Sequence, residues 1–210
     1  MADYSKQKIA LRYWLLGAGY HRAATALEFA ESYHVGVRKD GVTPEFAHQI
    51  QIASHVRTLL ATMRHPEEAL CVALLHDVRE DYDVADDTIR HHFGDVVADG
   101  VDAMTKTFRG VRRDDPTLFA RMAECPVASV VKPADRIHNQ STMVGVFTPQ
   151  KMADYVAETN DLFLPMLKAA KRNFPDQEPV YENHKLMLTG QLSFLEAILG
   201  DHNAHADHGD

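Results

Sequence analysis

Apolar residues recur at helical spacing along nearly the whole chain of 210 residues. A spacing of three and four residues places apolar side chains on one face of an α-helix, whereas a half-buried strand alternates, and no segment alternates convincingly. Helices are expected over residues 9–19, 23–34, 45–63, 66–81, 86–94, 95–106, 117–124, 127–147, 149–172 and 180–199. The sequence therefore predicts an all-α, single-domain helical bundle of about ten helices.

Glycine and proline mark the breaks between these helices. Gly17 and Gly19 separate the first two, and residues 37–44 hold a glycine and a proline that favour a loop. Pro133 falls inside one helical segment. Because proline has no amide hydrogen, we expect there either a kink or a late helix start just before Asp135.

Composition limits the classes of partner. A formal net charge of -8 argues against a nucleic-acid partner, which needs clustered Lys and Arg, but it leaves room for a small phosphorylated ligand. The apolar runs are too short to cross a bilayer and no secretory signal is evident, so no membrane partner and a cytoplasmic location are expected. Cys71 and Cys125 are expected to be free thiols. The sequence does not decide between a monomer and a homo-oligomer.

The stretch LLHDVRED, residues 74–81, places four polar side chains directly behind a run of apolar ones. Residues four apart share a helix face, so His76 should lie over Glu80, and Asp77 over Asp81. Burying a charge costs several kcal/mol per ion unless something compensates it. A divalent cation would relieve the repulsion, because imidazole and carboxylate are both good ligands for it.

Further ligands would have to come from other helices. His48 and Asp135 are the candidates, and together with His76 and Asp77 they offer two nitrogens and two carboxylates without a thiolate. That set suits Mn²⁺, Fe²⁺, Mg²⁺ or Zn²⁺, and the two remaining acids of the stretch could then serve as general base or acid for hydrolysis. A helix-capping role for Asp135 and a core role for His48 remain open at this point.

Several stretches resemble the HD-domain superfamily, and within it the RelA/SpoT-type (p)ppGpp hydrolase domain. They are VALLHDVRED, VVKPADRIHNQSTM, ALEFAESYHVGVRKDGVTPEFAH, IRHHFGDVVADGVDAMTK and FTPQKMADYVAETNDLFLPML. The resemblance covers about residues 23 to 168, in order and without large gaps. It implies an HD-type phosphohydrolase domain, which we expect over 23–200. Residues 1–22, before the resemblance, are expected to form an extra N-terminal helix, and the polar, His-rich residues 201–210 a disordered tail.

The resemblance also implies roles for individual residues of a stand-alone small alarmone hydrolase. The metal ligands, with Mn²⁺ as the usual ion, are His48, His76, Asp77 and Asp135. The acids that activate and orient the attacking water are Glu80 and Asp81. The residues facing the nucleotide are Arg38, Lys39, Asn139 and Thr142. The implied reaction removes the 3′-pyrophosphate of ppGpp or pppGpp, giving GDP or GTP and pyrophosphate.

Two departures from the family pattern leave the base preference open. Gln49 follows the first ligand where the family has proline, and the loop between Arg38 and His48 appears one residue longer than usual. The alternatives are therefore an HD phosphohydrolase acting on another nucleotide (ppApp, a dNTP or NADPH) and a non-catalytic nucleotide-binding module. The second alternative is disfavoured because every ligand and both acids are present.

Other basic side chains are candidates for holding phosphates. They are Lys132, Arg136, Arg109, Arg112 and Arg113. A solvated surface pair is the competing interpretation for the last two, and Arg79 and Arg136 would serve equally as ion-pair partners of the acidic stretch. His138 either supports a ligand or packs between helices.

Overall fold

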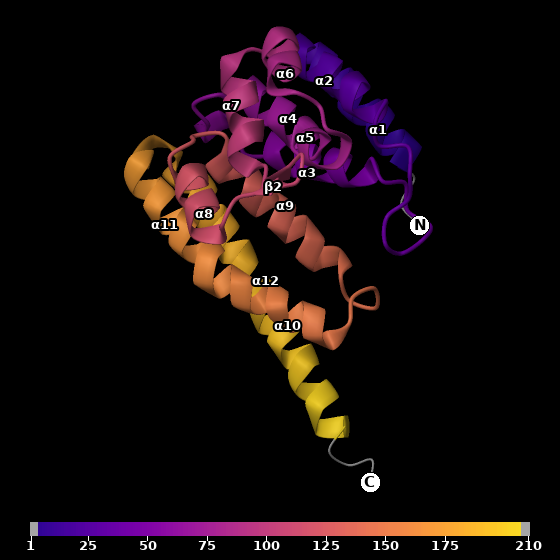
Figure 1. Cartoon of the computed structure of the whole chain (residues 1–210), viewed down its shortest axis with the longest axis vertical. Coiled ribbons are helices and arrows are strands. Elements are labelled where there is room, and N and C mark those ends of the chain that lie inside the picture. Colours follow the sequence, from indigo (N-terminus) through magenta and orange to yellow (C-terminus); the bar gives the residue numbers. More distant parts are fainter. Residues whose placement is uncertain (1–3, 207–210) are drawn as a thin grey trace.

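The computed structural model describes residues 4–206, which form a helical molecule (Figure 1). The elements are α1 (Tyr4–Gly17), α2 (His21–Glu31), α3 (Ala47–Arg57), η1 (Leu60–Thr62), α4 (Pro66–Leu75), α5 (Val78–Tyr82), α6 (Asp86–Phe93), α7 (Asp95–Met104), β1 (Thr107–Phe108), β2 (Val111–Arg112), α8 (Asp115–Ala123), α9 (Ala128–Thr142), α10 (Pro149–Glu158), η2 (Thr159–Phe163), α11 (Leu164–Asn173), η3 (Pro175–Gln177) and α12 (Glu178–Ala206). The all-α prediction is confirmed: the described residues add only a two-stranded hairpin to the helices.

The centre of the fold is α4, whose residues from Ala69 to Leu75 are all buried. Proline at its first turn and two glutamates nearby favour its start, since proline needs no amide partner there and acids complement the helix dipole. It packs against α2, α3, α7 and α9. Full burial contributes about 1.5–3 kcal/mol for each leucine side chain. The residues that directly follow α4 are thus held on a well-packed support.

The helix predicted over 66–81 is interrupted. α4 ends at Leu75 and α5 begins at Val78, so His76 and Asp77 lie at the junction. Their backbone remains close to helical, and the Asp81 amide still donates to the Asp77 carbonyl at 2.9 Å. Asp77, Glu80 and Asp81 of this stretch line one cavity, whereas His76 is buried.

α9 runs through Pro133 without starting late. It begins at Ala128, so the expectation of a start just before Asp135 is wrong. Asp135 lies inside the helix and cannot be its cap, which removes the capping alternative. α9 packs against α3 on one side and α12 on the other, and this brings Asp135 to the same region as His48.

The segment between α7 and α8 contains the small hairpin β1–β2. Its turn uses Arg109 and Gly110, whose φ angles are 48° and 78°. Two successive positive φ values suit a tight two-residue hairpin turn, and glycine tolerates the second position at no steric cost. The hairpin packs against α5 and therefore adjoins the polar junction.

The helices nearest the two ends of the described chain, α1 and α12, differ from the sequence prediction in their packing and in their length. α1 is part of the main core, because its Leu11 and Leu15 are buried there. At the other end α12 continues to Ala206 and reaches below the rest of the molecule in Figure 1, so helix occupies residues 201–206 of the segment predicted to be disordered. The remaining residues, 207–210, lie outside the described part of the chain.

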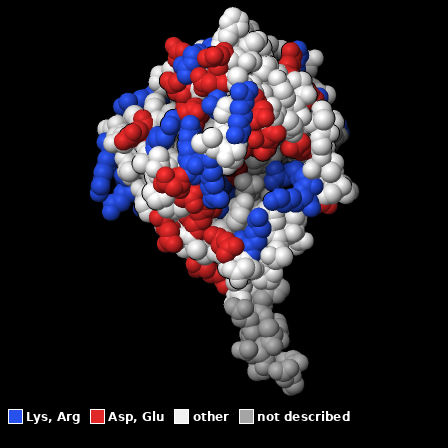
Figure 2. Space-filling model, viewed as in Figure 1, with Lys and Arg blue, Asp and Glu red and all other residues white. Residues whose placement is uncertain are grey.

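The cysteines, the surface charges and the helices were compared with the expectations from composition. Cys71 and Cys125 are free thiols, as predicted. On the face drawn in Figure 2, Lys and Arg side chains are interspersed with Asp and Glu. Among residues 4–206, none of the helices combines the length and apolar character needed to span a membrane.

Candidate metal centre

Residues from three parts of the chain meet beside the α4–α5 junction. His48 comes from the first turn of α3, His76 and Asp77 from the junction, and Asp135 from α9. His48, His76 and Asp77 each offer one ligand atom, and these atoms lie within 4.8 Å of one another. Asp135 lies outside that group of three but has its Oδ1 3.1 Å from His48 Nε2. The structure thus brings all four expected ligands into one cluster.

The ring orientations of both histidines suit metal binding. His76 Nδ1 lies 3.1 Å from the carbonyl oxygen of Ala73, which can only accept, so Nδ1 carries the hydrogen. His76 Nε2 then presents its lone pair toward Asp77, and it has no hydrogen-bond partner in the described part of the chain. His48 Nδ1 lies 2.8 Å from His138 Nδ1, which leaves Nε2 of His48 facing the carboxylates. Two fixed imidazole nitrogens beside two carboxylates fit a divalent cation of hard or borderline character.

Charges around the cluster keep the ligands in their binding forms. Burial raises the pKa of Asp135, but Lys132 and then His48 outweigh it, so this pKa lies well below its usual range. Lys132 Nζ and Asn139 Nδ2 donate to the Asp135 carboxylate at 2.8 and 2.6 Å. Burial lowers the pKa of His48 despite the neighbouring carboxylates, which favours the neutral imidazole. A neutral ring beside an ionised carboxylate is the state that coordinates metal.

Asp77 and His76 behave as a close pair. Burial opposes ionisation of Asp77, yet the neighbouring His76 holds the pKa of that carboxyl far below its ordinary value. In return, burial opposes protonation of His76 while the Asp77 carboxylate raises its pKa. The Nε2 of His76 and Oδ2 of Asp77 are 3.1 Å apart. A cation beside these two atoms would favour the neutral ring, because it competes with a proton for His76 Nε2.

The two acids on α5 occupy different surroundings. Glu80 accepts a hydrogen bond from the Lys106 amide at 3.0 Å through its Oε2. Desolvation in the cavity wall, followed by the charges of Asp77 and Glu80, raises the pKa of Asp81 to about 6. An acid that titrates near neutral pH can both take up and release a proton during a reaction. Of the two, Glu80 is held in place and Asp81 is poised to titrate.

These side chains open onto a cavity of about 800 Å³. It is lined by Tyr4, Val37, Arg38, Lys39, Asp40, Thr43, Glu45, Ala47, His48, Gln49, Asp77, Glu80, Asp81, Lys132, Asp135, His138, Asn139, Thr142, Val146, Phe147 and Tyr155. All the expected metal ligands, catalytic acids and nucleotide-facing residues are among them except His76, which contacts the lining residue Asp77. The cavity is large enough for a nucleotide.

The residues expected to face a nucleotide, Arg38, Lys39, Asn139 and Thr142, also line the cavity. Arg38 Nη2 donates to Asn139 Oδ1 at 3.2 Å, and Asn139 in turn donates to Asp135, so a polar chain runs from the loop to the metal cluster. The Lys39 ammonium lies 5.1 Å from the centroid of the Phe147 ring. Thr142 Oγ1 donates to the carbonyl of His138 at 3.1 Å. Basic side chains of the loop and acidic side chains of the junction and α5 thus line the same cavity.

Several of the other basic side chains that were candidates for holding phosphates form ion pairs within the protein. Arg136 pairs with Glu158 and lies 4.2 Å from the Tyr155 ring centroid, while Arg113 pairs with Asp102. Arg79 pairs with Asp102 and Asp86, and Arg136 with Glu158, so the expectation that these arginines pair with the acidic stretch is wrong. Lys132 does line the cavity, but its ammonium already contacts Asp135. For His138, the contact with His48 supports the ligand-supporting interpretation.

Sequence reasoning missed two contributors to the site. Gln49, only 1% exposed, donates from Nε2 to Asp77 Oδ2 at 3.1 Å. Its position next to the first expected ligand was a usable signal. Tyr4 lines the cavity from α1, and only the packing of α1 against α3 brings it there. No pattern in the sequence relates Tyr4 to the other residues.

Comparison with known proteins agrees with the family resemblance seen in the sequence. The family model described as HD domain matches residues 26–173. A GTP pyrophosphokinase of Streptomyces antibioticus is 32% identical over 147 residues, which cover 67% of this chain and 17% of the relative. A guanosine-3′,5′-bis(diphosphate) 3′-pyrophosphohydrolase of Vibrio cholerae is 32% identical over 145 residues, 65% of this chain and 20% of the relative. The bifunctional (p)ppGpp synthase/hydrolase SpoT of Escherichia coli is 29% identical over 153 residues, 69% of this chain and 21% of the relative. The chain thus spans about a fifth of the length of these relatives.

Proposed function

The chain belongs to the HD domain family, and from this premise we propose that it is a metal-dependent hydrolase of guanosine alarmones. The proposed reaction converts ppGpp to GDP, or pppGpp to GTP, with release of pyrophosphate from the 3′ position. The observation that carries the proposal is the convergence of His48, His76, Asp77 and Asp135 beside two further acids, at a cavity that basic side chains also line. Relatives named for this hydrolysis, at about 30% identity, support the choice of substrate.

The chemistry of the reaction requires an activated water and neutralised phosphate charge. A divalent cation bound by the four ligands would supply Lewis acidity, polarising a phosphoryl oxygen and lowering the pKa of water. We propose Mn²⁺ as that ion. Water then adds to the phosphorus attached to the ribose 3′ oxygen, and the bond between that phosphorus and oxygen breaks. The attacking water loses a proton and the 3′ oxygen gains one.

The proposed roles of the side chains follow from their surroundings. Asp81, with its pKa raised to about 6, takes the proton from the attacking water. Glu80 orients that water, because its carboxylate is fixed by the Lys106 amide. Arg38 and Lys39 bind the nucleotide, and Arg38 is oriented for this by its contact with Asn139. Binding and proton transfer are thereby assigned to different elements that line the cavity.

The direct test is a substrate panel. The protein is incubated with Mn²⁺ and ppGpp, pppGpp, ppApp, dNTPs or NADPH, and the products are separated by anion-exchange chromatography. We expect GDP and pyrophosphate from ppGpp, and loss of this turnover after metal removal with EDTA or in Asp77→Ala. Full turnover by the metal-free protein would contradict the proposed site.

A second nucleotide substrate is the alternative with an observation in its favour. Gln49 contacts a proposed metal ligand where the family has proline, and Tyr4 adds to the cavity wall from a helix outside the matched residues. The same panel decides: preferential turnover of ppApp, a dNTP or NADPH would select this alternative. Binding of ppGpp without turnover of any nucleotide would instead indicate a non-catalytic module.

A further inference from the structure

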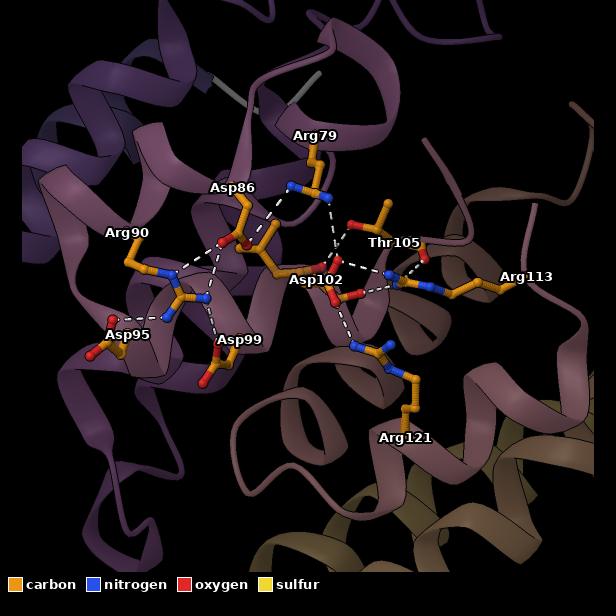
Figure 3. A network of polar contacts seen from close by, with 10 residues as sticks. Arg79, Asp86, Arg90, Asp95, Asp99, Asp102, Thr105, Arg113 and Arg121 are labelled. Atoms are coloured by element: carbon orange, nitrogen blue, oxygen red, sulfur yellow. Dashed lines mark hydrogen bonds and ion pairs between the residues drawn. The ribbon is translucent and has the colours of Figure 1, made fainter. Parts of the chain in front are cut away.

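Three arginines from three different elements meet at the carboxylate of Asp102, on α7 (Figure 3). Arg79 of α5 lies 3.4 Å from Asp102 Oδ1, Arg113 after β2 lies 2.8 Å from the same oxygen, and Arg121 of α8 pairs with Oδ2. The Asp102 side chain is 20% exposed. One partly buried carboxylate thus joins the elements that surround α5.

From Asp102, one path of contacts leads through Arg113 to Glu80. The Arg113 guanidinium also donates to the Thr105 carbonyl at 2.9 Å, which ties it to the end of α7. The Arg113 amide donates to the Lys106 carbonyl at 2.9 Å and closes the base of the hairpin. The Lys106 amide in turn donates to Glu80 Oε2 at 3.0 Å. The peptide that holds Glu80 is therefore held by a residue that Asp102 orients.

A second path leads through Arg79, the residue directly before Glu80. Its side chain is only 11% exposed and its guanidinium lies 4.0 Å from the centroid of the Phe108 ring in β1. Besides Asp102, it pairs with Asp86 at 3.8 Å, as Figure 3 shows. A guanidinium enclosed between an aromatic ring and two carboxylates fixes the backbone of α5 relative to the hairpin.

The position of the Glu80 carboxylate depends on its contact with the Lys106 amide. Glu80 and Asp81 are both exposed residues, and a long glutamate side chain next to solvent samples several rotamers unless a partner selects one. The described residues provide Glu80 with the Lys106 amide, whereas they provide no hydrogen bond to the Asp81 carboxylate. The position of the Glu80 carboxylate is thus set by the hairpin.

We infer that Asp102 is a positioning residue for the hydrolysis, acting on Glu80 through Arg113 and the Lys106 amide and through Arg79. The inference rests on the proposed function, in which Glu80 orients the attacking water. Asp102 does not line the cavity, so neither metal nor nucleotide binding should need it. Its removal should lower the rate of the chemical step and leave substrate binding intact.

The first experiment compares Asp102→Asn with Asp99→Asn. Asp99 is on the same helix one turn earlier, is 64% exposed and pairs with Arg90 at 2.7 Å, so it is a matched control. With ppGpp and Mn²⁺, Asp102→Asn should lower kcat by about 10- to 100-fold and change KM by less than about 2-fold, since small displacements of reacting groups cost rates of this order. Asp99→Asn should match the wild type, and Asp102→Glu should recover most of the lost rate.

The second experiment asks whether the effect passes through Glu80. In a Glu80→Gln background, measured by single turnover with excess enzyme, Asp102→Asn should lower the remaining rate by less than about 2-fold, because the residue it positions is already disabled. Hydrogen exchange of the Lys106 amide should be at least about 10-fold faster in Asp102→Asn and unchanged in Asp99→Asn. If Asp102→Asn does not fold, Arg113→Lys replaces it and should show the same pattern.

Equal losses of kcat in the two backgrounds would overturn the inference, because they would indicate a general structural role. So would a wild-type rate in Asp102→Asn or in Glu80→Gln. Turnover of ppGpp by the wild type and by Asp99→Asn would support the proposed function independently of the results for the other variants. Absence of turnover in the wild type would overturn the proposed function and this inference with it.

Discussion

His184 makes the free energy of unfolding depend on pH in a way that can be calculated. It lies on α12 with its side chain fully enclosed and stacks on His55 of α3, with ring centroids 5.2 Å apart. Neither ring nitrogen of His184 has a hydrogen-bond partner among the described residues. Burial, and secondarily the neighbouring His55, lower the pKa of His184 to about 3. The folded protein therefore keeps this ring neutral at pH values where the unfolded chain protonates it.

The size of the effect follows from proton linkage. The unfolded chain binds a proton at His184 below a pKa of about 6.5, whereas the folded chain does not until about pH 3. Stability from the neutral ring is complete above the unfolded pKa and is lost as the pH falls toward the folded one. Between pH 7.5 and 5.0 the loss from this residue is about 2 kcal/mol, from about 1.4 kcal/mol for each pH unit below the unfolded pKa. Because pH 5.0 is well above the folded pKa, the result is insensitive to its value.

The assay is urea unfolding of wild type and His184→Leu at both pH values, with EDTA present so that metal release does not contribute. Leucine removes both nitrogens at similar volume, so the variant should lose about 2 kcal/mol less than the wild type between pH 7.5 and 5.0. At pH 7.5 it should be at least as stable, since the buried nitrogens were unpaired. His21→Leu, at an exposed position, should keep the wild-type pH dependence. Equal losses in wild type and His184→Leu would refute the reasoning.

Three further changes test the fold and the site. Gly100→Ala should destabilise the protein by about 1–3 kcal/mol in urea unfolding, because the added methyl group would lie 2.8 Å from a valine of α4; unchanged stability would contradict the packing of α7. Gln49→Ala should weaken Mn²⁺ binding by about 10- to 100-fold in calorimetry, because it removes the donor that orients Asp77; unchanged affinity would rule out that role. Tyr4→Ala should raise KM for the nucleotide and leave Mn²⁺ affinity unchanged, whereas Tyr13→Ala, exposed on the same helix, should alter neither. Equal KM values in the two tyrosine variants would exclude Tyr4 from the binding surface.

The parts of this fold that follow from local pattern were predictable. The apolar residues of α4 form an unbroken run, so the burial of this helix could be predicted from the sequence alone. The proximity of His76 and Asp77 could be predicted because the two residues are adjacent in the sequence. The residues contributed by α3 and α9 were found through their spacing and the family resemblance, and the packing of these two helices against α4 explains why they meet. Local periodicity and a known pattern were sufficient for these features.

Other features depend on contacts between distant segments and left no local signal. The interruption after Leu75 is not marked by glycine or proline, and the backbone there stays nearly helical. Pro133 gave a misleading signal in the opposite direction, because tertiary packing of α9 outweighs one missing amide hydrogen bond. Tyr4 reaches the cavity only because α1 packs on α3. In each case the deciding energy comes from a partner that is remote in sequence.

The two adjacent acids of α5 show the same limit at the level of chemistry. Glu80 and Asp81 are indistinguishable as a pair of carboxylates in the sequence, and neither periodicity nor composition assigns them different roles. Other parts of the chain determine the environments of the two acids. Glu80 accepts a hydrogen bond from the Lys106 amide next to the hairpin, whereas desolvation and the nearby Asp77 charge raise the pKa of Asp81. A held carboxylate suits orientation of water, and one with a pKa raised to about 6 suits proton transfer. The division of labour proposed for the site is consequently a property of the fold around α5, because the hairpin and the cavity wall supply the contacts that distinguish the two acids.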